Sequence, residues 1–273
     1  MLNKATYTNH LNQTIEFGSG GIFLNDSEFY DYEWLYDSDY DEITNFHKGV
    51  TKKNATIIIA ANEEEEGLNI RNRIYEVFER DILAETPGKL EINGYHMSCY
   101  FNASKKSNYY YCNGYMVLTV NIISDSSDWI TEKEFMFLKN DATQDDKKKE
   151  YEYSYPYTYS SYVQSSSVVN PFFVESDFRL RIYGDVTNPS ITIGSHVYQI
   201  NTSIEKGQRV EIDSNKRTIK LIKQNGSIEN RFWEADKKSY IFEKIPTGEN
   251  AVQYDGTFGF DLILLDRRSE PGW

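Results

Sequence analysis

The sequence predicts a mostly-β protein that carries one α-helix and folds as two domains. β-branched and aromatic residues are abundant among its 273 residues, with 25 Ile, 22 Tyr and 15 Phe, and such residues favour pleated sheet. A long helical pattern occurs in only one segment, near residue 70, whereas short strand patterns recur about every ten residues from Phe178 onward. This spacing is typical of an all-β sandwich.

The first half begins with two strand patterns. In the segment FYDYEWLYD, residues 29–37, aromatic side chains alternate with carboxylates, which predicts a strand with its aromatic residues on one face. A second strand is predicted over residues 55–61, where the chain is apolar except at Thr56.

A change of period marks the predicted helix. Over residues 68–82, apolar residues recur at steps of three and four and so form one helical face, consisting of Ile70, Ile74, Val77, Phe78 and Ile82. Glu76 and Arg80 are four residues apart and are expected to pair on the surface. Pro87-Gly88 ends the helix.

Residues 95–101 and 109–123 are predicted to form a hairpin whose turn lies at residues 105–106. Such a turn places Cys99 opposite Cys112, so that a disulfide is geometrically possible. Because the chain begins without an apolar signal segment, we expect a reducing compartment and two free thiols.

The second half is predicted to be an all-β domain. Residues 141–170 are charged at first and then rich in Tyr and Ser, which indicates a linker or a strand along a sheet edge. We therefore expect one domain over residues 1–140 and another over residues 141–273. Alternating apolar residues predict two of its strands, with the buried faces Phe178, Leu180 and Ile182 and Phe258, Phe260, Leu262 and Leu264.

The net charge of −13 is concentrated in the first part of the chain. Residues 171–273 contain 14 basic and 15 acidic residues, a balance of −1, which leaves −12 for residues 1–170. Residues 26–42 contain eight acids and no base, and four glutamates follow at residues 63–66. Such a surface repels nucleic-acid phosphates, and no apolar run approaches the ~20 residues of a membrane helix. We therefore expect neither specific nucleic-acid binding nor membrane insertion.

No pattern in the sequence points to catalysis, a cofactor or a metal. The G-x-S-x-G turn of a serine nucleophile is absent. Residues 37–41 begin like a calcium loop, but Glu42 stands where a glycine is required and Lys48 where a bidentate glutamate is required. His96 and Cys99 supply only two metal ligands. We expect no catalytic residue, no cofactor and no metal site.

Several segments, taken in order, resemble the distal tail (Dit) proteins of siphophages. Tyr32-Glu33-Trp34-x-Tyr36 and the following Ile43-Thr44-Asn45-Phe46-x-Lys48-Gly49 resemble their early strands. The helical residues 72–78 and the sequence Pro87-Gly88-Lys89-Leu90 resemble their single helix and the next strand. In the second half, the similar segments are Ile182-Tyr183-Gly184, Asn188-Pro189-x-Ile191 and Arg268-Ser269-Glu270-Pro271-x-Trp273.

The resemblance implies an N-terminal belt domain, a β-sandwich-like fold with one helix, and a C-terminal galectin-like β-sandwich. It implies a structural component of a phage tail tip or baseplate rather than an enzyme. The belt domains would form a homohexameric ring that joins the tail tube protein to the tail-associated tip protein and the receptor-binding protein. The expected location is the tail tip of the virion, after assembly in the host cytoplasm.

Aromatic residues are the candidates for the ring interface, because aromatic side chains are enriched in interface cores. They lie in two segments of the first domain and are Tyr32, Trp34, Tyr36, Tyr109, Tyr110 and Tyr111.

The acidic residues have two interpretations. If the ring surrounds a channel for the genome, a negative wall lets DNA slide, whereas a basic wall traps it. Alternatively, these residues form a solvated outer face that keeps the ring soluble. The channel-facing candidates are Asp37, Asp39, Asp41, Glu64 and Glu65.

An alternative function is that of a carbohydrate-binding, lectin-like host-recognition protein that acts through the C-terminal sandwich. Sugar sites need several convergent polar groups around an apolar surface. Arg231 and Trp233 are the sugar-contact candidates, although a single Trp in a sandwich more often serves packing.

Overall fold

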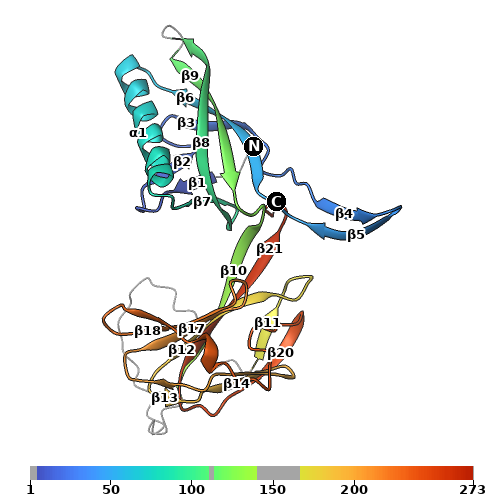
Figure 1. Cartoon of the computed structure of the whole chain (residues 1–273). Helices are drawn as coiled ribbons and strands as arrows, with labels where there is room; N and C mark the ends of the chain where they lie inside the picture. The colour runs from blue at the N-terminus through green and yellow to red at the C-terminus, as the bar shows by residue number, and fades with distance from the viewer. Residues whose placement is uncertain (1–4, 111–113, 140–166, 273) are drawn as a thin grey trace. The chain divides into compact units, whose positions relative to one another are not determined.

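The computed structural model describes residues 5–110, 114–139 and 167–272 (Figure 1). The predicted mostly-β fold is confirmed, and α1 (Glu64–Leu83) is the one α-helix within these ranges. No helix of the described residues is both long and apolar enough to cross a bilayer.

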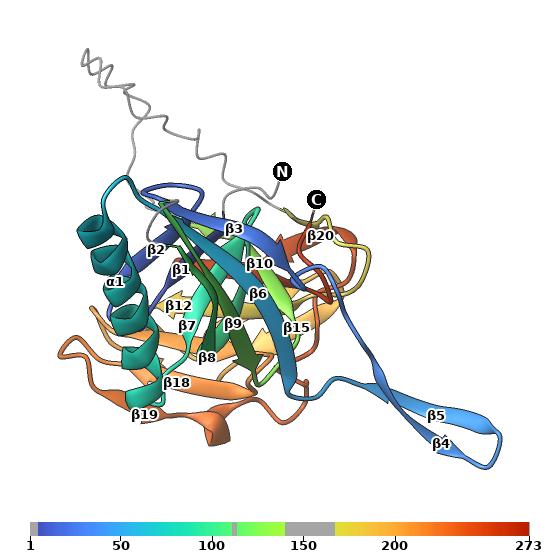
Figure 2. The ribbon, with the colours of Figure 1, turned by 90° about the horizontal axis from the view of Figure 1, so that it is seen from above.

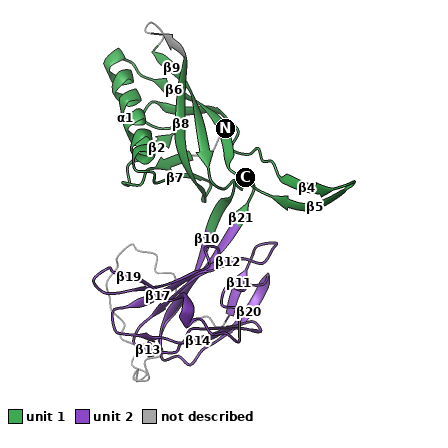
Figure 3. Cartoon of the chain, in the orientation of Figure 1, with its two compact units in different colours: residues 1–131, 267–273 green, residues 132–266 purple. Residues whose placement is uncertain are grey.

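The chain divides into two compact units (Figure 3). Unit 1 consists of residues 1–131 and 267–273, and unit 2 consists of residues 132–266. The chain therefore returns to unit 1 at its C-terminal end. The predicted domain boundary, between residues 140 and 141, lies outside the described residues.

Unit 1 is organised around one long strand, β8 (Tyr95–Tyr110), which changes partner along its length. Residues 95–99 pair antiparallel with β7, and residues 100–110 pair with β9. The resulting strand order is β2-β1-β7-β8-β9-β6-β3, and the buried side chains form one continuous core. The other strands are β1 (Ala5–Thr8), β2 (Thr14–Phe17), β3 (Ile22–Ser27), β6 (Thr51–Ala60), β7 (Gly88–Ile92) and β9 (Tyr115–Ser124).

Helix α1 buries the predicted face of Ile74, Val77 and Phe78 in this core. Glu76 and Arg80 pair on the surface as expected, with 3.9 Å between their charged groups. After the helix, Gly88 begins β7, and a Cβ atom at this position would lie 2.3 Å from the Tyr7 hydroxyl. Only glycine therefore permits this close approach.

The predicted hairpin turn at residues 105–106 is wrong. β8 continues through the polar segment, and Lys105 pairs with Thr119, so that the turn follows Tyr110. The register of β8 against β9 shifts just before and just after residues 103–106, which are exposed and, apart from Ala103, polar. Cys99 is a buried free thiol that pairs with Gly88 of β7, and Cys112 lies outside the described residues.

The predicted strand at residues 29–37 is largely wrong as well. The strand β4 (Leu35–Asp39) begins only at Leu35, after Tyr32 and Trp34. It pairs with β5 (Glu42–His47) in a two-stranded sheet of its own. This hairpin extends from unit 1 on the side opposite α1 (Figures 1 and 2). Alternation of aromatic and acidic residues here does not mark a core-facing strand, because both kinds of side chain are exposed.

Unit 2 contains two sheets that share one hydrophobic core, as in a β-sandwich. One sheet has the order β19-β18-β17-β12-β21, and the other has the order β11-β20-β14-β15. The predicted faces of Phe178, Leu180 and Ile182 and of Phe258 to Leu264 are buried in this core. The first sheet contains β12 (Asp177–Tyr183), β17 (Arg209–Asp213), β18 (Thr218–Ile222), β19 (Ile228–Asn230) and β21 (Phe260–Arg268).

The second sheet of unit 2 contains β11 (Ser167–Asn170), β14 (Ser190–Ile193), β15 (His196–Gln199) and β20 (Gly248–Gln253). A short pair, β13 (Val186–Thr187) and β16 (Ser203–Ile204), completes the unit. β10 (Trp129–Phe137), like β21, contains residues of both units.

Candidate functional site

The β4–β5 hairpin, hereafter the arm, is the most exposed element of unit 1. All residues of both strands are exposed, although a two-stranded hairpin is at best marginally stable by itself. Its large apolar side chains are between 45% and 99% exposed and are Leu35, Tyr36, Tyr40, Ile43 and Phe46. Clustered exposed apolar side chains mark interaction surfaces. The arm is therefore a candidate interaction surface.

The base of the arm is held by a chain of charged contacts. Lys48 Nζ lies 4.5 Å from the centre of the Trp34 ring and donates a hydrogen bond to Asp128 Oδ1 at 2.7 Å. Asp128 also accepts a hydrogen bond from Arg267, in the C-terminal segment of unit 1. The same lysine thus connects both ends of the arm to the body of the unit.

These contacts shift the ionisation of Asp128. Burial alone would raise the pKa of its carboxyl group, but the hydrogen bond from Lys48 and the charges of Arg267 and Lys48 hold the pKa below its ordinary value. Asp128 is therefore ionised at neutral pH, and both cations remain paired with it.

A second anchor lies on the N-terminal side of the arm. Lys53 is 4% exposed, and its ammonium group donates hydrogen bonds to the backbone carbonyls of Glu28 and Asp31. Burial lowers the pKa of Lys53, while the nearby carboxylates of Asp31 and Glu28 counteract the shift. The chain that leads into the arm is therefore fixed to β6.

The predicted interface residues fall on two elements. Tyr32, Trp34 and Tyr36, which are 58%, 44% and 61% exposed, lie at the base and start of the arm. Tyr109 and Tyr110 end β8, on a different part of unit 1. Tyr111 lies outside the described residues.

The acidic candidates are likewise divided between two elements. Asp37, Asp39 and Asp41 lie on the arm and are exposed, whereas Glu64 and Glu65 form the first turn of α1. Carboxylates at this position suit the positive end of the helix dipole. Because the arm and α1 lie on opposite sides of unit 1 (Figure 2), the two acidic groups do not form one patch within a chain.

The sugar-contact candidates lie in unit 2, at the short 3₁₀ helix Phe232–Glu234. Trp233 is 87% exposed. Arg231 is engaged by two carboxylates of its own chain, with Nη1 2.5 Å from Glu234 and Nη2 2.7 Å from Glu229, and these contacts raise its pKa. The site thus presents an aromatic surface, while its guanidinium group is already paired.

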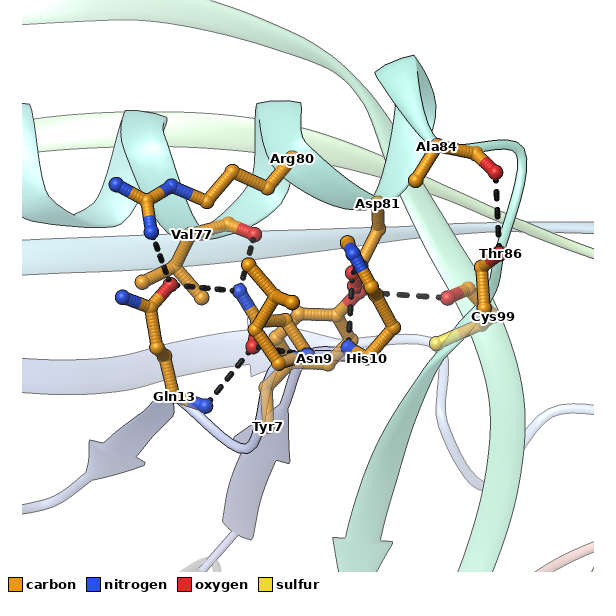
Figure 4. Close-up of polar contacts among 11 residues, drawn as sticks. Tyr7, Asn9, His10, Gln13, Val77, Arg80, Asp81, Ala84, Thr86 and Cys99 are labelled. Atoms are coloured by element: carbon orange, nitrogen blue, oxygen red, sulfur yellow. Dashed lines mark hydrogen bonds and ion pairs between the residues drawn. The ribbon is translucent and has the colours of Figure 1, made fainter. Parts of the chain in front are cut away.

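One buried polar network was not apparent from the sequence (Figure 4). Asp81 of α1 is fully buried and accepts hydrogen bonds from the Tyr7 hydroxyl and from the backbone N–H of His10 at 3.0 Å. Burial and the hydrogen bond to Asp81 raise the pKa of Tyr7, which keeps its proton on the hydroxyl. The network fastens α1 to β1 and the following turn. A periodicity analysis could not reveal it, because Tyr7 and Asp81 are 74 residues apart.

The described residues contain no group of three or more His, Cys, Asp and Glu side chains arranged to hold a metal ion. The network around Asp81 is directed into the core of unit 1, so its chemistry is that of a structural anchor.

Neither a protein-family model nor a curated protein matches the sequence. Solved structures nevertheless resemble the chain over nearly its whole length. The crystal structure of the Dit protein of phage SPP1, described as a paradigm of the hub adsorption apparatus in phages that infect Gram-positive bacteria, has a TM-score of 0.59 at 10% identity. It covers 97% of this chain and 99% of its own.

The baseplate of phage P2 in its activated conformation, solved with Ca and with Sr, contains chains with TM-scores of 0.62 and 0.58, both at 12% identity. They cover 99% and 98% of this chain and 100% and 99% of their own. The resemblance to phage distal tail proteins is thus confirmed at the level of the fold: the two units together have the fold of phage hub and baseplate proteins.

Proposed function

We propose that the protein is a structural component of a phage tail tip or baseplate, and not an enzyme. One observation carries this proposal: hub and baseplate chains share the fold over at least 97% of this chain. Fold alone does not determine function, but the exposed arm adds a feature that an assembly protein requires and that a monomer would avoid.

Within the tail tip, unit 1 assembles through the arm into a closed ring of six copies. The arm lies on one side of the unit only (Figures 1 and 2), so it suits a head-to-tail contact, and head-to-tail contacts form a ring where the rotation between neighbouring copies closes. The ring joins the tail tube protein to the tail-associated tip protein and the receptor-binding protein, and unit 2 is its galectin-like sandwich. The location is the virion tail tip, after assembly in the host cytoplasm.

Native mass spectrometry of the full chain tests the ring. We expect a mass of six chains at micromolar concentration. A variant in which residues 37–45 are replaced by a short Gly-Ser turn removes only exposed residues, so it should fold normally and remain monomeric. A wild-type chain that stays monomeric at micromolar concentration, with or without tail partners, would contradict the ring.

A lectin-like role in host recognition is the second candidate, and the exposure of Trp233 is the observation that favours it. Exposed aromatic rings of this kind bind the apolar face of a sugar, but the pairing of Arg231 with its own carboxylates leaves fewer polar groups for a ligand. A glycan array probed with the full chain and with Trp233→Ala decides between the two roles. Binding that the substitution abolishes would support a lectin, and an array without signal would favour the purely structural role.

A further inference from the structure

A groove of about 490 Å³ lies between α1 and the later part of β8 in unit 1. Phe78 of α1 and Phe101 of β8 form its apolar floor, with their rings stacked at a centroid distance of 3.9 Å. Leu118 of β9 and the exposed ring of Tyr75 extend this apolar surface. The volume lies within the range of about 300–1,000 Å³ in which proteins bind small ligands, so a large aromatic side chain fits.

The rim of the groove is positively charged, in a protein whose net charge is −13. Arg71 of α1 and Lys106 of β8 both line it, and Glu79 is the one carboxylate of the lining. Neither cation forms a salt bridge within the described ranges, and the Arg71 guanidinium group donates only to the neighbouring Asn72 amide oxygen at 3.2 Å. Two cations are thus available to an acidic partner.

The tip of the arm has the complementary chemistry. Tyr40 stands at the turn between β4 and β5 and is 99% exposed. Asp39 precedes it, and Asp41 and Glu42 follow it, all of them exposed. An aromatic ring flanked by carboxylates matches an aromatic floor flanked by cations, and aromatic pairs gain energy beyond the burial of their area.

The placement of the two surfaces also suits a contact between copies. The arm and α1 lie on opposite sides of unit 1 (Figures 1 and 2), so the arm of one chain cannot be expected to fill its own groove. In a head-to-tail arrangement, the side that carries the arm meets the opposite side of the next copy. The groove then receives the arm of a neighbour.

We propose that the arm tip of one chain docks in the groove between α1 and β8 of a second copy, with Tyr40 over Phe78 and Phe101 and with Asp39 and Asp41 beside Arg71 and Lys106. The inference rests on the proposed ring and identifies its contact. It assigns Asp39 and Asp41 to this contact in place of the channel wall, for which Asp37, Glu64 and Glu65 remain candidates. The aromatic ring supplies most of the affinity, and the charges set the orientation and the choice of partner.

Two variants and their mixture test the docking. The tip variant carries Asp39→Ala, Tyr40→Ala and Asp41→Ala, and the groove variant carries Arg71→Glu and Lys106→Glu. Each should weaken assembly at least tenfold in sedimentation equilibrium and should be monomeric at a concentration at which the wild type is a ring. Lys105→Glu is the matched control, because Lys105 is exposed on the same strand but does not line the groove.

The equimolar mixture gives the decisive result. The tip variant retains an intact groove and the groove variant an intact arm, so one native contact can form, and we expect dimers and nothing larger. A chain that combines Asp39→Lys and Asp41→Lys with Arg71→Glu and Lys106→Glu should regain the ring, since the charges are exchanged across the contact. Urea unfolding of each variant confirms that it is folded.

The outcomes separate this docking from the ring itself. If the tip and groove variants assemble like the wild type, or if the mixture remains monomeric, the docking is wrong although the ring stands. If the wild type forms no ring at any concentration, the ring and the docking are both overturned.

Discussion

At the scale of single residues, Asp81 shows how one buried carboxylate holds α1 in place. Its two oxygens accept hydrogen bonds from the Tyr7 hydroxyl and the His10 backbone, and His10 Nδ1 lies 2.5 Å from the same carboxylate. Removal of a buried acceptor leaves each of these donors without a partner, which costs more than the loss of one ordinary hydrogen bond. The groove beside α1 depends on this attachment, because α1 forms one of its walls.

We therefore expect Asp81→Ala to lower the free energy of unfolding by about 3 kcal/mol. Tyr7→Phe removes one donor and keeps the ring in the aromatic cluster, so it should cost about 1–2 kcal/mol. Glu76→Ala, on the exposed face of the same helix, is the control and should change the value by less than about 0.5 kcal/mol. Urea unfolding curves measure all three, and an Asp81→Ala variant as stable as the control would show that the network is dispensable.

At the scale of elements, the sequence predicts best where a face is buried in the core of its own chain. Phe178, Leu180 and Ile182 alternate because one face of β12 meets the core of unit 2, and the helical face of α1 is recognisable for the same reason. The segment around Tyr32 and Trp34 alternates in the same way, but its side chains are exposed. Local periodicity cannot distinguish a core-facing strand from an exposed segment with the same alternation, so the sequence does not predict the arm.

The candidate site is only partly predictable for a similar reason. Residue type predicts Tyr36, Asp39 and Asp41, since aromatic and acidic clusters are visible in the sequence. The groove is not visible, because Arg71 and Lys106 come together through the packing of α1 on β8. The polar residues around Lys106 predict a turn by composition, and only the pairing with β9 shows that they belong to a strand.

The base of the arm is expected to respond to acid through Asp128. Its pKa is held below the ordinary value of 3.8 in the folded state, so its ionisation stabilises the fold above this value. The contribution disappears as the pH falls through the lower folded pKa. At pH 7 we expect Asp128→Asn to lower the free energy of unfolding by about 2 kcal/mol, and this difference should vanish at acid pH.

Urea unfolding from pH 7 to pH 2, at a concentration below that of assembly, measures this difference. Hydrogen exchange of peptides that cover residues 28–50 should show faster exchange in the Asp128→Asn variant, because Lys48 loses its charged partner. The exposed Asp125 supplies the control, and Asp125→Asn should match the wild type at every pH. A difference between Asp128→Asn and wild type that stays constant down to pH 2 would mean that ionisation of Asp128 does not anchor the arm.

At the scale of the whole molecule, the charge is divided unevenly along the chain. Residues 1–170 carry −12 and residues 171–273 carry −1, so the electrostatic repulsion of nucleic acid belongs mainly to the part of the chain that contains most of unit 1, which we propose to form the ring. If the docking uses Asp39 and Asp41, the candidates left to face a channel or the outer surface are Asp37 and the glutamates at the start of α1, and the glutamates lie away from the arm. Residues on the outer surface are accessible to any DNA molecule, whereas residues on a channel wall are accessible only to DNA that enters the channel.

A comparison of linear with closed circular DNA distinguishes the two placements. We expect the wild-type ring to bind neither linear nor closed circular DNA at about 50 mM salt, because each chain carries a net charge of −13 that repels phosphates. The variant Glu64→Lys with Glu65→Lys adds twelve lysines to a ring of six and should bind DNA with an affinity that falls steeply as salt rises. If these residues face a channel, preformed variant rings should bind linear DNA, which can thread, and not closed circles, which cannot. Equal binding of both forms would place them on the outer face, and binding by the wild-type ring would contradict the electrostatic argument itself.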